Sequence, residues 1–264
     1  MRRQLDITMT ATIRPEIVAI TLQSFKEKLF DLYPCRLLLN VDPVGDNTKT
    51  QMDVVDVCYK YFKDIIFKLP DEPSLPKAFR WCWEQVMNEF VFHLEDDWEL
   101  LQDVNIRDMM AFMDKTPNLV SLRLSAWKAE ENRVRAVEGT TNPHKFIYYN
   151  FFDKFFEVGD WQKYQLGCSG HPGLWASSFI QEALRHLTTD RNPEKMLRYN
   201  RNIRRIADKY RFGVWIQPNE NRQIRDLGEG WRTDNGLFKA GGANKAYFHY
   251  WSKDPDPYKE LEED

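Results

Sequence analysis

The stretch Phe90-Val91-Phe92-His93-Leu94-Glu95-Asp96-Asp97-Trp98 decides the fold. Its first five residues are mostly apolar and predict a buried strand, which ends at three adjacent acids. Three neighbouring carboxylates repel one another unless a cation or fixed dipoles compensate their charge. Mg²⁺ and Mn²⁺ bind carboxylate oxygens and often bridge to the phosphates of a substrate. The stretch therefore favours a metal site at a strand end over the alternatives, a solvated acidic turn or a helix N-cap.

The residues before this stretch alternate between strand and helix patterns. Strands are expected at residues 5–9, 35–41 and 65–67, and helices from Pro15 onward and over residues 52–61 and 77–88, with residues 10–14 as a polar loop. Such alternation is typical of a parallel α/β sheet, in which ligands gather at the carboxyl ends of the strands. Thr10, Asp42 and the acidic triplet each follow a strand, so we expect them to lie close together.

The later part of the sequence gives weaker patterns. Helices are expected at residues 106–113, 177–187 and 193–210, and strands at 119–124, 213–216 and 246–251. Residues 168–175 are rich in Gly and Pro and indicate a loop before a helix. Residues 125–168 are rich in aromatic residues and receive no assignment.

Length and composition indicate one domain. The chain has 264 residues, of which 42% are hydrophobic, and we expect a single domain over residues 1–253 with halves at 1–125 and 126–253. Residues 254–264 are acidic and are expected to form a tail. The sequence has neither a signal-peptide pattern nor a membrane-spanning apolar run, and its four cysteines have no metal-binding spacing. A cytoplasmic protein with reduced thiols and no membrane contact is therefore expected.

Three short motifs resemble one family of enzymes. Residues 10–16 (TATIRPE), Asn40-Val41-Asp42 and the acidic triplet are similar to motifs of GT-A glycosyltransferases, especially the family-2-like group. The resemblance implies a mixed, mainly parallel sheet flanked by helices, a nucleotide-sugar donor, expected to be UDP-linked, and Mn²⁺ or Mg²⁺. Asp97 would bind the metal, and Glu95 or Asp96 would contact ribose or metal. The resemblance also implies that the nucleotide is contacted by Thr10, Thr12, Arg14 and Asp42.

Several later residues are further candidates. His249 is a candidate third metal ligand or a core histidine, and His171 a base, a sugar contact or part of a plain helix-entry turn. Asp226 is a candidate catalytic residue in a Gly-bearing loop, with Arg225 or Arg232 on the diphosphate. The alternative is an ordinary surface loop.

Basic residues are concentrated between residues 185 and 232, where twelve Lys and Arg face six Asp and Glu. A phosphate-binding face and a merely solvated face both fit the five basic residues of the helix expected at 193–210. These residues are Arg198, Arg201, Arg204, Arg205 and Lys209.

Two strings narrow the resemblance. Residues 76–81 (PKAFRW) and 94–100 (LEDDWEL) are similar to phage-encoded glycosyltransferases that modify hydroxymethylated pyrimidines in DNA. This implies double-stranded DNA as a partner, and the cytoplasm of the host cell as the location if the protein is phage-encoded. A cytosolic transferase for a polysaccharide or lipid-linked glycan, and a non-catalytic nucleic-acid or glycan binding module, are the alternatives.

Overall fold

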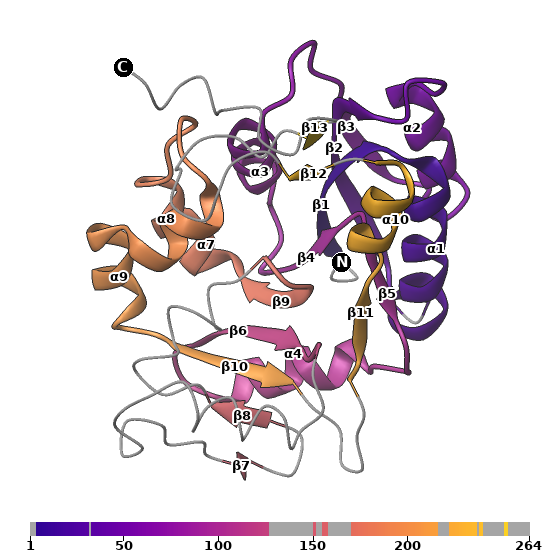
Figure 1. Cartoon of the computed structure of the whole chain (residues 1–264). Coiled ribbons are helices and arrows are strands. Elements are labelled where there is room, and N and C mark those ends of the chain that lie inside the picture. The colour runs from indigo at the N-terminus through magenta and orange to yellow at the C-terminus, as the bar shows by residue number, and fades with distance from the viewer. Residues whose placement is uncertain are drawn as a thin grey trace, which may run out of the picture.

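A nine-stranded mixed sheet forms the centre of the computed structural model, which describes residues 4–31, 33–126, 150–151, 155–157, 170–215, 222–236, 238–239 and 251–252. The strand order is β3-β2-β1-β4-β9-β6-β10-β8-β7 (Figure 1). The strands are β1 (Leu5–Ile13), β2 (Cys35–Gly45), β3 (Ile65–Lys68), β4 (Phe90–Glu95), β6 (Leu119–Leu124), β7 (Asn150–Phe151), β8 (Phe155–Glu157), β9 (Gly173–Ala176) and β10 (Arg211–Trp215).

Helices cover both faces of this sheet. The helices are α1 (Pro15–Phe25), α2 (Gln51–Tyr59), α3 (Leu75–Glu84), α4 (Ile106–Lys115), α7 (Ser177–Leu184), α8 (Pro193–Tyr199) and α9 (Arg201–Ala207), with a π-helical turn at Lys26–Phe30 after α1. One core cluster joins the sheet to α1, α2 and α4, and a second joins it to α3, α7, α8 and α9. The predicted mixed sheet flanked by helices is thus confirmed.

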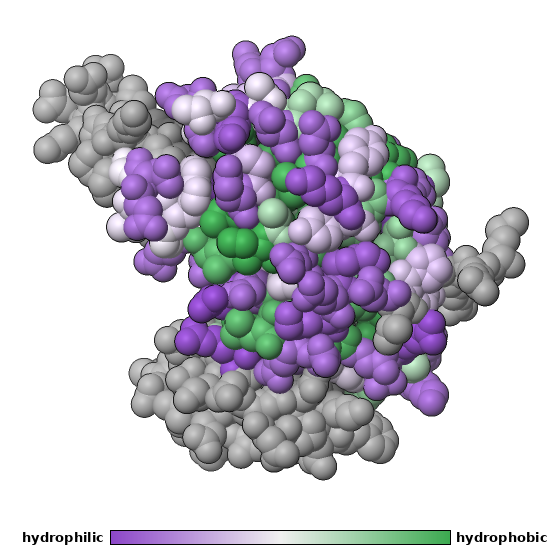
Figure 2. Space-filling view, turned by 90° about the vertical axis from the view of Figure 1, so that its right-hand side faces the viewer, coloured by the Kyte–Doolittle hydropathy of each residue, from purple (hydrophilic) through white to green (hydrophobic). Residues whose placement is uncertain are grey.

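The surface on the side of α1 and α2 is mainly polar. Figure 2 shows the face toward α1 and α2, where hydrophilic residues predominate among the described ones. Ile20, Met52 and Tyr59 are isolated exceptions on these two helices. Such amphipathic helices are expected around a buried sheet. Among the described residues, no helix has both the length and the apolarity that a membrane crossing requires.

Strand β1 is longer than predicted and occupies the loop expected at residues 10–14. It pairs in parallel with β2 and β4, which extends its backbone hydrogen bonding as far as Ile13. The helix then begins at Pro15, as predicted, because proline suits the first helical position. Thr10 therefore lies between β2 and β4, whereas Thr12 is paired with β2 alone.

The loop expected at residues 168–175 contains a strand instead. Gly173–Ala176 forms β9, which lies antiparallel between β4 and β6. A Cβ atom at Gly173 would lie 2.6 Å from the Cα of Arg123, so only glycine allows this approach. Gly173, which suggested a loop, is instead required for the close pairing of β9 with β6.

The single helix expected at residues 193–210 is two helices. Asn200 ends α8 and begins α9, and its side chain accepts hydrogen bonds from the N–H groups of Asn202 and Ile203. Asparagine is a strong N-cap residue, and it adopts a non-helical backbone conformation here. The five basic residues consequently do not share one continuous helix face.

A short ribbon brings a late segment back to the acidic turn. Strand β5 (Trp98–Leu100) pairs antiparallel with β11 (Ile224–Asp226), and α10 (Gly228–Asp234) follows β11. Figure 1 shows α10 beside the ends of β1 and β4. A third, two-stranded sheet joins β12 (Phe238–Lys239) and β13 (Trp251–Ser252).

Candidate active site

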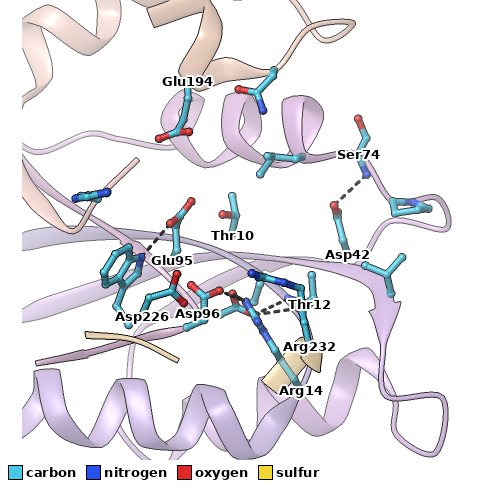
Figure 3. A pocket seen from close by; sticks show the side chains of 18 residues that line it. Thr10, Thr12, Arg14, Asp42, Ser74, Glu95, Asp96, Glu194, Asp226 and Arg232 are labelled. Carbon is cyan, nitrogen blue, oxygen red and sulfur yellow. Dashed lines mark hydrogen bonds and ion pairs between the residues drawn. The ribbon is translucent and has the colours of Figure 1, made fainter. Parts of the chain in front are cut away.

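A cavity of about 320 Å³ lies at the carboxyl ends of β1, β2 and β4 (Figure 3). It brings together Thr10, Asp42 and the acidic triplet, which confirms that they converge. Residues far away in the sequence complete it. Its lining comprises Thr10, Ala11, Thr12, Arg14, Asp42, Val44, Pro73, Ser74, Leu75, Glu95, Asp96, Asp97, Trp98, His171, Asn192, Glu194, Asp226 and Arg232.

Asp96 is bound on all sides by the protein itself. Its Oδ2 accepts hydrogen bonds from the backbone N–H and the hydroxyl of Thr12, at 2.9 and 3.2 Å. Arg14 donates to both carboxylate oxygens, through Nε at 2.9 Å and through Nη2. The backbone oxygen of Asp96 accepts a hydrogen bond from the hydroxyl of Thr21. This carboxylate joins the end of β1 to the turn after β4.

Asp97 shares the same arginine. The Nη2 atom of Arg14 lies 2.8 Å from its Oδ2, while 16% of the Asp97 side chain stays exposed. Burial alone would lower the pKa of Arg14, but the charges of Asp96 and Asp97 outweigh it and raise the pKa, so the guanidinium keeps its charge. The acidic turn therefore contains a permanent internal cation.

Helix α10 is packed directly onto Asp97. The N–H of Leu227 donates to the backbone oxygen of Asp97 at 2.7 Å. A Cβ atom at Gly228 would lie 2.0 Å from Asp97 Oδ2, so a larger residue would displace either the helix or the carboxylate. The guanidinium carbon of Arg14 lies 5.9 Å from the ring centre of Trp231. Residues 227–231 thus form one wall over the acidic turn.

Glu95 points to a different part of the cavity. Its Oε2 accepts a hydrogen bond from the indole N–H of Trp98 at 3.0 Å. Burial raises its pKa well above the ordinary value, and the charges of Asp97 and Glu194 add to the rise. Burial and neighbouring negative charge both favour the protonated form of a carboxylic acid.

Glu194 is the acid that sequence reasoning missed. It lies in the first turn of α8, where its Oε1 accepts from the N–H of Gly170 at 2.5 Å and from Arg198 at 3.4 Å. An added Cβ at Gly170 would touch the carboxylates of both Glu194 and Glu95, so the two acids border the same point. The string Asn192-Pro193-Glu194 is a helix-start signal, but it does not indicate a cavity.

Asp42 lies at the opposite end of the cavity from this pair. It accepts hydrogen bonds from the side chain of Asn40 at 2.8 Å and from the N–H of Ser74 at 2.9 Å. Burial raises its pKa, although both hydrogen bonds oppose the rise. Figure 3 shows Asp42 and Ser74 away from Glu95 and Glu194.

His171 and Asp226 both reach the cavity, but each has a partner within the protein. His171 Nδ1 lies 3.2 Å from Arg123 Nη1, and burial together with the charges of Arg123 and Arg198 lowers the histidine pKa to about 3. Asp226 Oδ1 accepts from the N–H groups of Gly228 and Glu229 and so caps α10. The catalytic roles expected for both residues stay predictions.

The two candidate diphosphate arginines are separated. Arg232, on α10, lines the cavity. Arg225 does not line it, because its guanidinium binds Glu99 across the β5–β11 ribbon. The structure therefore offers Arg232 rather than Arg225 to a ligand in this cavity.

The basic residues of α8 and α9 are partly engaged within the protein. Arg198 binds Glu194, Arg204 donates to the backbone oxygen of Arg198 at 2.7 Å and lies over the ring of Tyr199, and Lys209 lies 3.7 Å from Glu182. Arg201 and Arg205 are exposed on α9.

The carboxylates suit a metal that a ligand helps to bind. Within the described ranges, no group of three or more His, Cys, Asp or Glu is arranged to hold an ion. His249, the expected third ligand, lies outside the described residues. Mg²⁺ and similar ions often use only one or two carboxylates together with phosphates of a substrate. Asp97 and Glu95, both partly exposed acids of the turn, fit such a site.

Comparisons with known proteins place the fold. Solved structures with a similar fold include TarS of Staphylococcus aureus, with a TM-score of 0.52, 14% identity and coverage of 83% of this chain and 36% of that chain. Another is the mannosyltransferase PcManGT of Pyrobaculum calidifontis, solved with GDP-Man and Mn²⁺, with a TM-score of 0.50, 12% identity and coverage of 83% and 55%. The chain has the GT-A fold, as predicted. The sequence matches no protein-family model and no curated protein.

TarS residues 1–349 have also been solved in complex with UDP and with UDP-GlcNAc. Both complexes have TM-scores of 0.50 and 13% identity to this chain. The chain covers 59% and 57% of those solved chains, so it spans less than two thirds of their length. At this level of identity, the similarity to these structures shows the fold alone.

The division of roles in the acidic turn predicts unequal effects on stability. We expect Asp96→Asn to lower the free energy of unfolding by about 3 kcal/mol, because it breaks a buried ion pair. Asp97→Asn keeps the Asp96–Arg14 contacts and should cost less than about 1 kcal/mol. Urea unfolding of both variants measures the difference. Equal losses would show that Asp96 has no special structural role.

Proposed function

We propose that this protein is a glycosyltransferase that moves a sugar from a nucleotide-sugar, with UDP the expected nucleotide, to a hydroxyl acceptor. The observation that carries the proposal is the convergence of Thr10, Asp42 and the acidic turn in one cavity at the strand ends of a GT-A sheet. The two solved folds named above bind UDP, UDP-GlcNAc or GDP-Man. A non-catalytic module for phosphate has no use for acids in such a cavity.

The residues along the cavity match the order of base, diphosphate and sugar in such a donor. Asp42, with Ser74 beside it, would contact the nucleobase. Arg232 would bind the diphosphate, near the acidic turn. The sugar would then lie toward Glu95, Trp98 and Glu194, at the far end of the cavity from Asp42 (Figure 3). Thr10 and Thr12 line the strand side between these ends.

Asp97 and Glu95 would hold Mn²⁺ or Mg²⁺ in the presence of the diphosphate. The ion, when bound, supplies positive charge to the diphosphate leaving group. Arg232, which lines the cavity from α10, adds a second positive charge. Arg14 is committed to Asp96 and Asp97, so its contribution is to orient the acids rather than to bind the nucleotide.

Glu194 is our candidate for the general base. It lines the cavity next to Glu95, and its contacts with Gly170 and Arg198 orient its carboxylate. In a single displacement, the acceptor oxygen bonds to the anomeric carbon of the sugar and the bond from that carbon to the diphosphate breaks. The acceptor proton moves to Glu194. This course inverts the anomeric carbon.

The metal role is tested by nucleotide release from a panel that includes UDP-glucose, UDP-GlcNAc and GDP-mannose. We expect EDTA, and separately Asp97→Asn, to lower turnover about 100-fold or more, because the leaving diphosphate loses its counter-charge. Asp56→Asn, an exposed change on α2, is the matched control and should have no effect. Full activity of Asp97→Asn, or full activity in EDTA, would remove the metal from the mechanism.

The base role is tested by Glu194→Gln. Turnover should fall by about 10²- to 10⁴-fold while the affinity for the donor changes little, because proton transfer alone is lost. Glu84→Gln, in an exposed ion pair with Arg80 on α3, is the control and should behave like the wild type. If Glu194→Gln keeps its turnover number, another group accepts the proton.

For the acceptor, hydroxymethylated pyrimidines of double-stranded DNA are our candidate. The support is the sequence resemblance together with exposed Arg201 and Arg205 on α9, whose charges are available to a phosphate backbone. A polysaccharide or lipid-linked glycan is the alternative, and a hydroxyl on any of these acceptors suits the cavity. The cytoplasm, where such DNA is found, is the proposed location.

DNA binding is measured as a function of salt concentration. We expect the double reversal Arg201→Glu/Arg205→Glu to weaken binding and to reduce the slope of log affinity against log salt by about 2, because two phosphate contacts are lost. The control, Lys60→Glu/Lys63→Glu after α2, carries the same charge change on other exposed residues. Equal loss in both variants, or no binding at low salt, would favour a glycan acceptor.

A further inference from the structure

The surroundings of His171 fix the position of its proton. Arg123, on β6, is 1% exposed, and its Nη1 lies 3.2 Å from Nδ1 of His171. The histidine ring centre lies 5.0 Å from that of Trp98, whose indole N–H is bound to Glu95. Strand β9, which follows His171, lies against β6 and sets this pairing, with Gly173 opposite Arg123.

A guanidinium group can donate hydrogen bonds but cannot accept them. Nδ1 of His171 must therefore be the acceptor, and a neutral ring then carries its single proton on Nε2. A second proton would place a positive imidazolium beside Arg123, and the charge of Arg198 would oppose it as well. The lowering of the His171 pKa to about 3, by burial and by these two arginines, agrees with a neutral ring.

The geometry points to His171 as a hydrogen-bond donor, locked in the Nε2–H form by Arg123, that binds a hydroxyl oxygen of the transferred sugar. This inference rests on the proposed function, because it places the sugar at the Glu95–Trp98 end of the cavity. A ring whose Nδ1 already accepts from Arg123 does not serve as a base through that atom. His171 is thus a specificity-determining residue, and Arg123 is a positioning residue that acts through it.

The tautomer is tested by nitrogen NMR of protein labelled with ¹⁵N-histidine, without any substrate. The five histidines are distinguished by the signals that disappear in His171→Gln. We expect His171 to keep a protonated Nε2 and an unprotonated Nδ1 from pH 8 to pH 5. An Nδ1–H form, or a titration near pH 6.5, would overturn the inference. This result does not depend on whether any sugar is transferred.

The donor role is tested by comparing His171→Leu with His171→Gln, using whichever donor of the panel is turned over. The glutamine amide can place an N–H near the position of Nε2, whereas leucine cannot. We expect kcat/KM to fall about tenfold in His171→Leu, the value of one hydrogen bond, and to recover to within about threefold in His171→Gln. The affinity for UDP alone should stay unchanged in both variants.

A base would behave differently, because both substitutions remove it and both would abolish turnover. That result would overturn the donor role. His186→Gln, just after α7 and not among the residues that line the cavity, is the control and should match the wild type. If no donor is turned over by any variant, the proposed function fails, while the NMR measurement still decides the tautomer.

The role of Arg123 is tested with Arg123→Met and, because a buried arginine can be needed for folding, with Arg123→Lys. In Arg123→Met, which removes the donor and its charge, we expect His171 to populate both tautomers and its pKa to rise toward the ordinary value. In Arg123→Lys, whose ammonium group can only donate, a lysine that reaches Nδ1 should keep the Nε2–H form. The charge of Arg198, which also lowers the pKa of His171, remains in both variants. An unchanged tautomer in a folded Arg123→Met protein would show that Arg123 does not position His171.

Discussion

The ion pair between Arg14 and Asp96 is the interaction on which the acidic turn depends. Arg14 follows β1 and Asp96 follows β4, so the pair joins the ends of two neighbouring strands. Both side chains are buried, and an unpaired charge in either place would be costly. Thr12 adds two further hydrogen bonds to Asp96, and α1 begins directly after Arg14. The end of the strand, the turn and the start of the helix are thereby fixed together.

The Arg14–Asp96 pair also gives different surroundings to three acids that look equivalent in sequence. Asp96 is buried and forms hydrogen bonds and an ion pair with Arg14. Asp97 forms an ion pair with the same guanidinium but stays partly exposed. Glu95 accepts a hydrogen bond from the indole N–H of Trp98. Gly228 then brings α10 into contact with Asp97. A ligand that binds at Asp97 therefore meets residues more than a hundred positions later in the chain, because the β5–β11 ribbon carries them there.

Local patterns predicted the parts of the fold that obey local rules. The strand at 119–124 was placed correctly, and Thr10, Asp42 and the triplet meet because parallel strands end at one edge. Strand β9 was missed because Gly173 resembles a loop residue, whereas glycine is required there because a Cβ atom would collide with the backbone of Arg123. The break at Asn200 was missed because its capping role depends on backbone geometry that a charge pattern does not reveal.

In the candidate site, too, local patterns predicted some features and missed those that depend on tertiary contacts. The sequence located the acids but not the partners that tertiary contacts assign to them. Arg14 was expected at the nucleotide, yet two carboxylates bind it, and Arg225 was expected at the diphosphate, yet Glu99 holds it outside the cavity. Glu194 was missed because it is one of a few acids in a mainly basic stretch, with no acidic neighbour in sequence to mark it. Only the packing of α8 against the loop at Gly170 brings it to Glu95.

The order of charges along the cavity determines which kind of ligand fits it. Asp42 marks one end, Glu95 and Glu194 mark the other, and the cations Arg14 and Arg232 lie between them (Figure 3). A molecule with a negative centre and two neutral, hydroxyl- or amide-bearing ends complements this order, whereas a molecule with a terminal phosphate would set that phosphate against an acid. A nucleotide-sugar has the first arrangement, because its diphosphate lies between base and sugar. The internal arginine thus orders the acids and also limits which anions the cavity accepts.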